Sequence, residues 1–220
     1  MKMTLKTTFI LTATAALLAL PALSKADTMY SIGLFNISGY TGPYASVNVS
    51  LTSSTTATIT FTSLTNSGLI YLLGAQGCVA VNVNASSWTL GTVTGVNSGT
   101  GFSPGPFSNG GAGNEDGWGS FNQTINSMGA FTQSSDMITF SLTNTGGTWA
   151  NSDSVLGANG SGYSVAAHIL VTTDPANASN GALVTGYATN GGSVPDGGTT
   201  VMLLGSALGG LGLLRRFFRR

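Results

Sequence analysis

Apolar residues recur at every second position in four short runs in the middle of the chain. The runs extend from Val47 to Leu51, Ala57 to Phe61, Ile138 to Leu142 and Tyr163 to Val171. Successive side chains of a strand point to opposite faces, so this spacing places one apolar face of each run on a core. No segment between these runs shows a convincing 3.6-residue period. The pattern predicts β-strands throughout the middle of the chain.

Three shorter apolar segments complete a predicted all-β domain over residues 27–186. They are residues 69–73, 79–83 and 183–187, separated by turns of Gly, Ser and Asn. Thr is abundant within the runs, which suits a pleated surface with one exposed face. Many short strands with such turns predict an antiparallel β-sandwich, jelly-roll-like in form. Residues 187–193, rich in Gly, are expected to form a flexible linker after the domain.

The charged residues are few, 6% of the chain, and they are unevenly placed. Residues 27–193 contain six carboxylates and no Lys or Arg, which gives this part a formal charge of −6. Nucleic-acid binding requires clustered basic side chains that displace counterions from phosphates. A nucleotide site of the P-loop type requires a Lys in a Gly-rich loop. We therefore expect neither nucleic acid nor nucleotide as a partner.

The first 26 residues have the three parts of a secretory signal peptide. Lys2 and Lys6 form the basic part, and the apolar residues 9–20 follow. Ser24 and Ala26 place small residues where signal peptidase reads the chain, so we predict cleavage after Ala26. An uncleaved helical anchor is the alternative, but the apolar part is short for the roughly 20 residues of a membrane span.

Residues 194–220 also have three parts, which together predict a membrane segment. A turn-forming motif comes first, and an uncharged apolar segment follows it as far as Leu214. The 18 residues from Gly197 to Leu214 are near the lower limit for a transmembrane helix. A basic cluster after such a helix stops it in the inner membrane with the cluster in the cytoplasm. A helix of the folded domain is the alternative, but it would need a polar face. The basic cluster consists of Arg215, Arg216, Arg219 and Arg220.

This order of motif, apolar helix and terminal Arg cluster resembles the sorting domains of PEP-CTERM proteins. The motif resembles the variant that reads Val-Pro-Asp-Ser-Gly: Val194, Pro195, Asp196 and Gly198 match it, and Gly197 stands where Ser is usual. The resemblance implies recognition by an exosortase, a membrane enzyme that processes the tail near the motif. It also implies transit through the inner membrane of a bacterium with an outer membrane and exopolysaccharide. The destination would be the cell surface, outer membrane or extracellular matrix.

Residues 95–119 show no strand pattern and contain nine glycines and two prolines, so we expect a long loop. Loops of this length are usually functional or disordered. Asn114, Glu115 and Asp116 offer the oxygen ligands that calcium prefers. Their spacing matches no established calcium loop, so a solvated turn is the simpler interpretation and no metal is expected. Trp118 beside them could stack on a sugar ring or pin the loop to the core.

Candidate catalytic residues are scarce, since His168 is the only histidine and Cys78 the only cysteine. A zinc site needs three or four ligands, and a reactive thiol needs a neighbouring cation. No Gly-x-Ser-x-Gly segment presents a serine nucleophile. We interpret Cys78 as a buried strand residue and His168 as a structural residue opposite the better apolar face of its strand. We expect no cofactor and no enzymatic activity.

These features favour an exported structural or adhesive protein of an exopolysaccharide or biofilm matrix. The alternative is a carbohydrate-binding surface module, with or without calcium, that uses residues 114–116 and Trp118. Both hypotheses have signal peptidase and an exosortase as processing partners and extracellular polysaccharide as the ligand. Both also use the same β domain, so the sequence favours neither by its fold.

Overall fold

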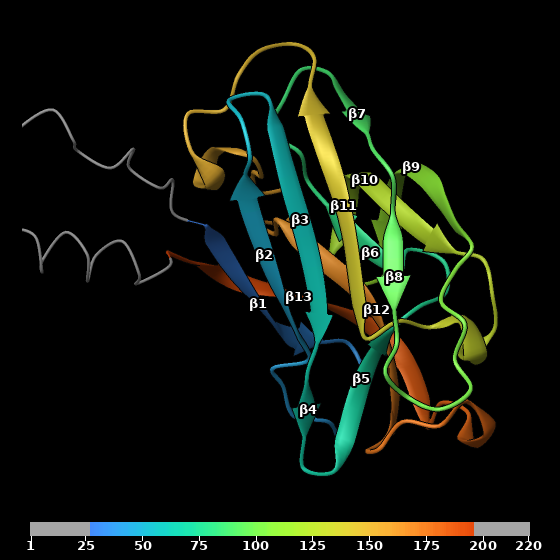
Figure 1. Cartoon of the computed structure of the whole chain (residues 1–220). Helices are drawn as coiled ribbons and strands as arrows, with labels where there is room; N and C mark the ends of the chain where they lie inside the picture. Colours follow the sequence, from blue (N-terminus) through green and yellow to red (C-terminus); the bar gives the residue numbers. More distant parts are fainter. Residues whose placement is uncertain (1–26, 196–220) are drawn as a thin grey trace, which may run out of the picture.

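The computed structural model describes residues 27–195, which form an all-β domain (Figure 1). The predicted signal peptide (1–26) and residues 196–220, with the predicted membrane helix, lie outside the described residues. Within residues 27–195, no helix has the length and apolar character needed to cross a membrane.

In the described part of the chain, thirteen strands share one hydrogen-bonded sheet, and every pair of these strands is antiparallel. Three short 3-10 helices lie in the connections. The strands are β1 (Thr28–Phe35), β2 (Ala45–Leu51), β3 (Thr56–Ser63), β4 (Thr65–Asn66), β5 (Leu69–Leu73), β6 (Val79–Val81), β7 (Trp88–Leu90), β8 (Thr94–Val96), β9 (Phe107–Glu115), β10 (Gly119–Ser127), β11 (Met137–Asn144), β12 (Val165–Thr173) and β13 (Val184–Pro195). The 3-10 helices are η2 (Phe131–Gln133), η3 (Ser152–Ser154) and η4 (Ala178–Asn180).

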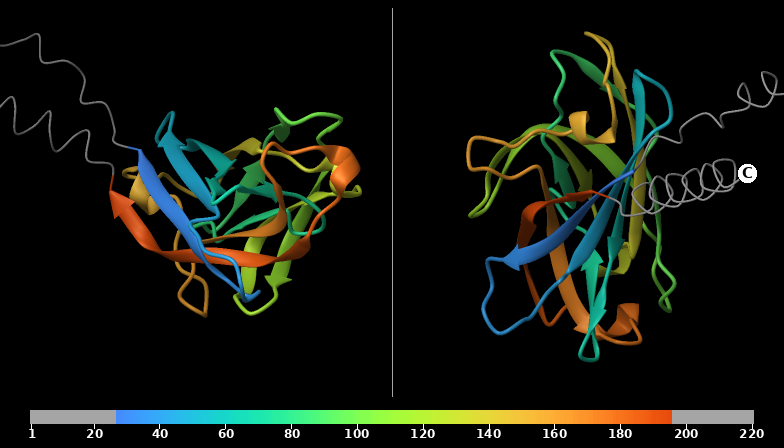
Figure 2. Two further views of the ribbon diagram at one scale, coloured as in Figure 1. Left: turned by 90° about the horizontal axis from the view of Figure 1, so that it is seen from below. Right: turned by 90° about the vertical axis from the view of Figure 1, so that its left-hand side faces the viewer.

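The sheet curls until its two halves face each other and is nearly barrel-shaped (Figures 1 and 2). The main strand order is β7-β11-β3-β2-β1-β13-β12-β6-β10-β9, with β8 on β11, and β5 pairing with both β12 and β4. The predicted all-β antiparallel class is confirmed. The two layers expected as separate sheets of a sandwich are instead joined by β1 and β13.

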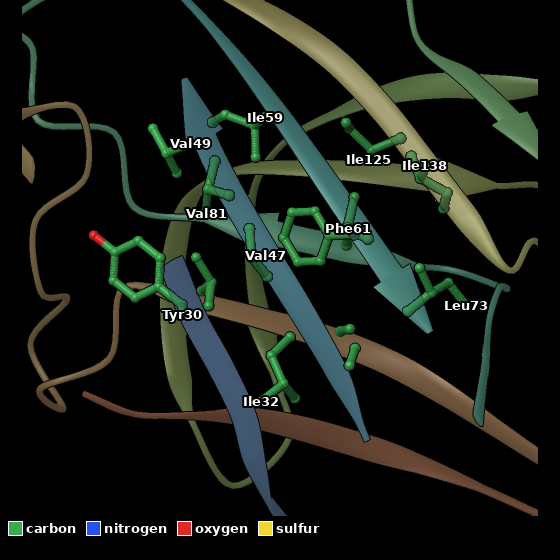
Figure 3. Packing of buried hydrophobic residues seen from close by; sticks show 14 of the residues in the cluster. Tyr30, Ile32, Val47, Val49, Ile59, Phe61, Leu73, Val81, Ile125 and Ile138 are labelled. Atoms are coloured by element: carbon green, nitrogen blue, oxygen red, sulfur yellow. The ribbon is translucent and has the colours of Figure 1, made fainter. Parts of the chain in front are cut away.

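The core fills the space between the two halves, as the alternating runs predict. In β2, β3 and β11 every second residue is buried. Val47, Ile59 and Phe61 point inward toward Leu73 and Ile125 (Figure 3). The rings of Phe61 and Phe140 stack with centroids 6.2 Å apart.

Residues 187–193, predicted as a flexible linker, lie within β13, so that prediction is wrong. The glycines that suggested a linker occupy irregularities of the β1–β13 ladder. The register shifts by one residue between Asn190 and Ser193, where Gly191 and Gly192 lie, and again at Gly33 on β1. An extra residue on one strand of an antiparallel pair is a β-bulge, which glycine accommodates easily.

The prediction of a loop over residues 95–119 is also mostly wrong, because the second half of this segment forms the β9–β10 hairpin. The glycines of β9 allow close contact with β10 instead of marking a loop. A Cβ atom on Gly110 would lie 2.3 Å from the Thr124 Oγ1 atom, and one on Gly113 would lie 2.8 Å from the Thr124 Cγ2 atom. Because glycine has no side chain, β9 lacks the alternation of apolar and polar residues that would have predicted a strand.

Phe61→Ala should strongly destabilise the domain, because Phe61 is fully buried between the two halves. Removal of a buried Phe side chain costs about 3–5 kcal/mol of the free energy of unfolding. Urea unfolding of the purified protein measures this loss. Thr58→Ala, three positions away on the outer face of the same strand, should change the free energy of unfolding by less than about 0.5 kcal/mol.

Candidate functional site

The predicted sorting motif begins inside the folded domain. Val194 and Pro195 are the last two residues of β13, and their partners on β1 are Met29 and Thr28. The start of β1 and the end of β13 therefore lie side by side (Figure 2). The remaining residues predicted for processing lie outside the described residues: Ser24, Ala26, Asp196, Gly197, Gly198, Arg215, Arg216, Arg219 and Arg220.

The first residues of β1 are fixed by contacts on the side of β2. The Thr28 Oγ1 hydroxyl donates to Asp153 Oδ1 at 2.5 Å, and Thr28 is only 1% exposed. The Asn48 Nδ2 group donates to Asp27 Oδ2 at 3.0 Å. The start of β1, which pairs with the first residues of the sorting motif, is thus held in place by contacts that do not involve the motif.

The predicted ligand residues Asn114, Glu115, Asp116 and Trp118 lie at the tip of the β9–β10 hairpin. The tip is docked on β13, because the Trp118 Nε1–H donates to the Tyr187 carbonyl at 2.9 Å. The indole is half-buried and meets the ring of Tyr163 edge-on, with centroids 5.3 Å apart. Its N–H and one ring edge are therefore engaged in pinning the tip.

Asn36, which follows β1, fastens the tip further. Its Nδ2 group donates to the Asp116 carbonyl at 3.1 Å, and its Oδ1 atom accepts from the Tyr187 N–H at 2.8 Å. Asn159 donates from Nδ2 to the Trp118 carbonyl at 3.0 Å. Three amide or indole side chains thus hold the tip without any ion pair.

The sequence suggested that Glu115 belongs to a solvated turn. In the structure Glu115 instead lies beneath this tip, with 2% of its surface exposed. Its Oε2 atom is buried without a hydrogen-bond partner. The carboxyl group fits because its neighbour is Gly77, where a Cβ atom would lie 2.5 Å from Oε1. Burial raises the pKa of Glu115 to about 7.

The three oxygen-bearing residues of the tip do not converge on a cation. Asn114 and Asp116 are exposed, whereas Glu115 between them is buried, as alternation along a strand requires. Across residues 27–195, no group of three or more His, Cys, Asp or Glu side chains is placed to hold a metal ion.

His168 and Cys78 both have structural environments. The His168 ring stacks on Tyr187 with centroids 4.4 Å apart, and its Nδ1 atom lies 3.1 Å from the Gln76 carbonyl. Burial lowers the pKa of His168, which favours the neutral ring. The Cys78 thiol is buried and donates to the Ile125 carbonyl at 3.1 Å. Burial raises the pKa of Cys78 to about 12, so the thiol is not a nucleophile at neutral pH.

The outer face of β2, β3 and β11 is a polar surface that was not predicted from the sequence. Apart from Met137 at the start of β11, its side chains are Ser, Thr and one Asn, and none is charged. They form rows across the strands: Asn48 pairs with Thr60 and Thr60 with Thr139, and the Oγ1 atoms of the last two lie 3.2 Å apart. The hydroxyl face, as we call it, consists of Ser46, Asn48, Ser50, Thr56, Thr58, Thr60, Thr62, Thr139, Ser141 and Thr143. Reading the polar positions of the alternating runs as a set would have found it.

Comparison with known proteins identifies the tail. The model of the VPDSG-CTERM motif matches residues 193–218. The chain therefore carries a PEP-CTERM-like sorting tail of the predicted variant, which implies processing by an exosortase-type enzyme. No curated protein and no solved structure is significantly similar to the chain.

Because the Glu115 carboxyl group is buried, we expect the stability of the domain to depend on pH, and we expect Glu115→Gln to remove this contribution. A folded-state pKa of about 7, above the ordinary value of 4.5, means that the folded state retains a proton that the unfolded state loses. The free energy of unfolding contributed by Glu115 should therefore fall as pH rises from about 4.5 to about 7 and be constant outside this range. Urea unfolding of the purified protein at a series of pH values measures the slope.

The neighbouring Tyr187 and Cys78 have pKa values raised by burial and do not titrate in this range. His168, which stacks on Tyr187, has a pKa lowered by burial, so its contribution to stability rises with pH. The difference in slope between wild type and Glu115→Gln therefore isolates the contribution of Glu115. Asp116→Asn is the matched control, because Asp116 is adjacent and exposed, and it should keep the wild-type slope. An unchanged slope in Glu115→Gln would show that other groups cause the pH dependence.

Proposed function

We propose that this protein is a structural or adhesive component of an exopolysaccharide or biofilm matrix, sorted to the bacterial surface by an exosortase, and not an enzyme. The sorting motif at residues 193–218 carries the export part of this proposal. Signal peptidase would remove residues 1–26, and the tail would cross the inner membrane only in transit. The destination would be the outer membrane, the cell surface or the surrounding matrix.

The hydroxyl face supports the adhesive part of the proposal. A neutral polysaccharide presents hydroxyl groups that both donate and accept hydrogen bonds, as Ser and Thr side chains do. The rows of hydroxyls lie on a regular sheet, so an extended sugar chain could contact several of them at once. The three strands contribute no charged side chain to this face, and the Asp27 carboxylate beside it already accepts a hydrogen bond from Asn48.

The alternative, a carbohydrate-binding site at the hairpin tip, has weaker support. Trp118 already uses its N–H and one ring edge within the domain, and Glu115 is buried beneath the tip. A sugar site there would first require the tip to leave β13. We therefore prefer the hydroxyl face as the contact surface for polysaccharide.

Deletion of residues 197–220 should release the protein to the medium or leave it misplaced, because the membrane segment and the Arg cluster are lost. This deletion is preferable to removal of 194–220, since Val194 and Pro195 belong to β13 and their loss would also shorten a strand. Fractionation of tagged protein between membrane, outer surface, matrix and medium measures the effect. The same distribution for deleted and full-length chains would contradict the sorting proposal.

The triple variant Thr58→Val, Thr60→Val and Thr139→Val should weaken retention on neutral polysaccharide. Val preserves the β-branched shape and removes the hydrogen bonds, each worth about 0.5–1.5 kcal/mol. Binding should weaken by about tenfold or more, measured as the dissociation constant on immobilised polysaccharide from the producing bacterium.

The control is Val at Thr132, Thr173 and Thr185, which are exposed elsewhere on the domain and should leave binding unchanged. Equal losses in the two triple variants would argue against the hydroxyl face as the contact surface.

A further inference from the structure

We propose that β1 presents the sorting motif to the processing enzyme, and that an exosortase-type enzyme docks on the edge of β13 formed by residues 191–195. This inference rests on the proposed sorting function. In this inference the enzyme recognises the folded domain as well as the sequence of the tail.

The motif and the domain share residues. The match to the sorting motif begins at Ser193, and Ser193, Val194 and Pro195 pair with Tyr30, Met29 and Thr28. These three residues are therefore held in an extended conformation by β1. A processing enzyme that meets the folded protein finds this part of the motif as a strand and not as a flexible peptide.

One edge of this strand segment is available for docking. The ladder between β12 and β13 ends at Ala166 and Thr189. The Asn190 Oδ1 atom closes it by accepting from the N–H groups of Ser164 and Val165, at 3.0 and 3.1 Å. Among the described strands, only β1 pairs with β13 beyond this point.

An unpaired strand edge binds an extended segment of a partner by adding a strand to the sheet. The partner that must contact residues 193–195 is the enzyme that reads the motif. Edge docking beside the motif gives this enzyme backbone hydrogen bonds that do not depend on which residues occupy positions 196 and 197.

The arrangement also makes recognition depend on folding. Thr28 and Pro195 lie at opposite ends of the described chain, so they pair only when the domain has closed. An unfolded chain contains the same motif but does not present it on β1. Sorting would then favour folded protein.

The test separates the motif from β1 without changing either. Six residues, Gly-Ser-Gly-Ser-Gly-Ser, are inserted between Gly192 and Ser193 of the full chain. The insertion lowers the effective concentration of the motif at its position on β1, and tail removal should slow by about fivefold or more. Pulse labelling in the producing bacterium followed by intact-mass measurement gives the rate.

The control places the same six residues between Ser67 and Gly68, two exposed residues of the turn between β4 and β5, and should keep the wild-type rate. Thr28→Val provides a second variant: it removes the bond to Asp153, preserves shape, and should slow tail removal by about twofold. Thermal unfolding of each variant confirms that the domain remains folded.

Tail removal at the wild-type rate or faster in a folded protein with the insertion before Ser193 would overturn the inference. Its failure is distinguishable from failure of the proposed function. If deletion of 197–220 relocates the protein while the insertion has no effect on the rate, sorting stands and presentation by β1 is wrong. If that deletion has no effect on location, the sorting function itself is wrong.

Discussion

The pairing of the first strand with the last is the contact on which the rest of this domain depends. β1 and β13 occupy the middle of the strand order, with β2, β3 and β11 on one side and β12, β6 and β10 on the other. Without this pair the two halves are separate sheets that cannot enclose one core. Tyr30 and Ile32 from β1 and Ala188 from β13 enter that core directly. Because the cost of closing a loop rises slowly with its length, pairing such distant strands costs little more than pairing nearer ones.

The absence of Lys and Arg from residues 27–195 constrains how polar groups are satisfied inside the domain. Amide side chains, which donate and accept at once, take the place of ion pairs. Asn122 shows this most clearly: its Oδ1 atom accepts from the Val83 N–H at 2.6 Å, and its Nδ2 group donates to the Val83 carbonyl at 2.9 Å. The side chain thus acts as one more strand residue. Glu115 is the exception, and without a cation to stabilise its carboxylate, burial alone sets its pKa.

Alternation was a sufficient signal wherever one face of a strand is buried and the other is polar. The runs that became β2, β3, β11 and β12 could be predicted for this reason, and the short apolar β5 could be predicted from its bounds. β9 could not, because glycines that fit against Thr124 carry no side chains to alternate. β1 escaped notice because only Tyr30 and Ile32 are large apolar residues that point inward from it, and Gly33 follows them.

The candidate site was predictable in its residue types but not in its geometry. Asn114, Glu115, Asp116 and Trp118 do lie together in a turn region, as their adjacency requires. The burial of Glu115 depends on Gly77, and the position of Trp118 depends on Tyr187, both distant in sequence. No local pattern encodes such contacts. The tail was more predictable than the domain because its signal is a short linear order of motif, apolar segment and basic cluster.

The overlap between β13 and the motif also limits how the domain can sit near a membrane. Only Asp196, Gly197 and Gly198 separate Pro195 from the uncharged segment that begins at Thr199. Three residues and their flanking bonds span at most about 14 Å when fully extended. If the segment from Thr199 crosses a membrane, as the sequence predicts, the paired ends of β1 and β13 lie within this reach of its start. A flexible linker over 187–193 would have lengthened this reach, whereas these residues belong to a strand that pairs with β12 as far as Thr189 and with β1 as far as Pro195. The described domain therefore continues without a flexible linker as far as Pro195, three residues before that segment.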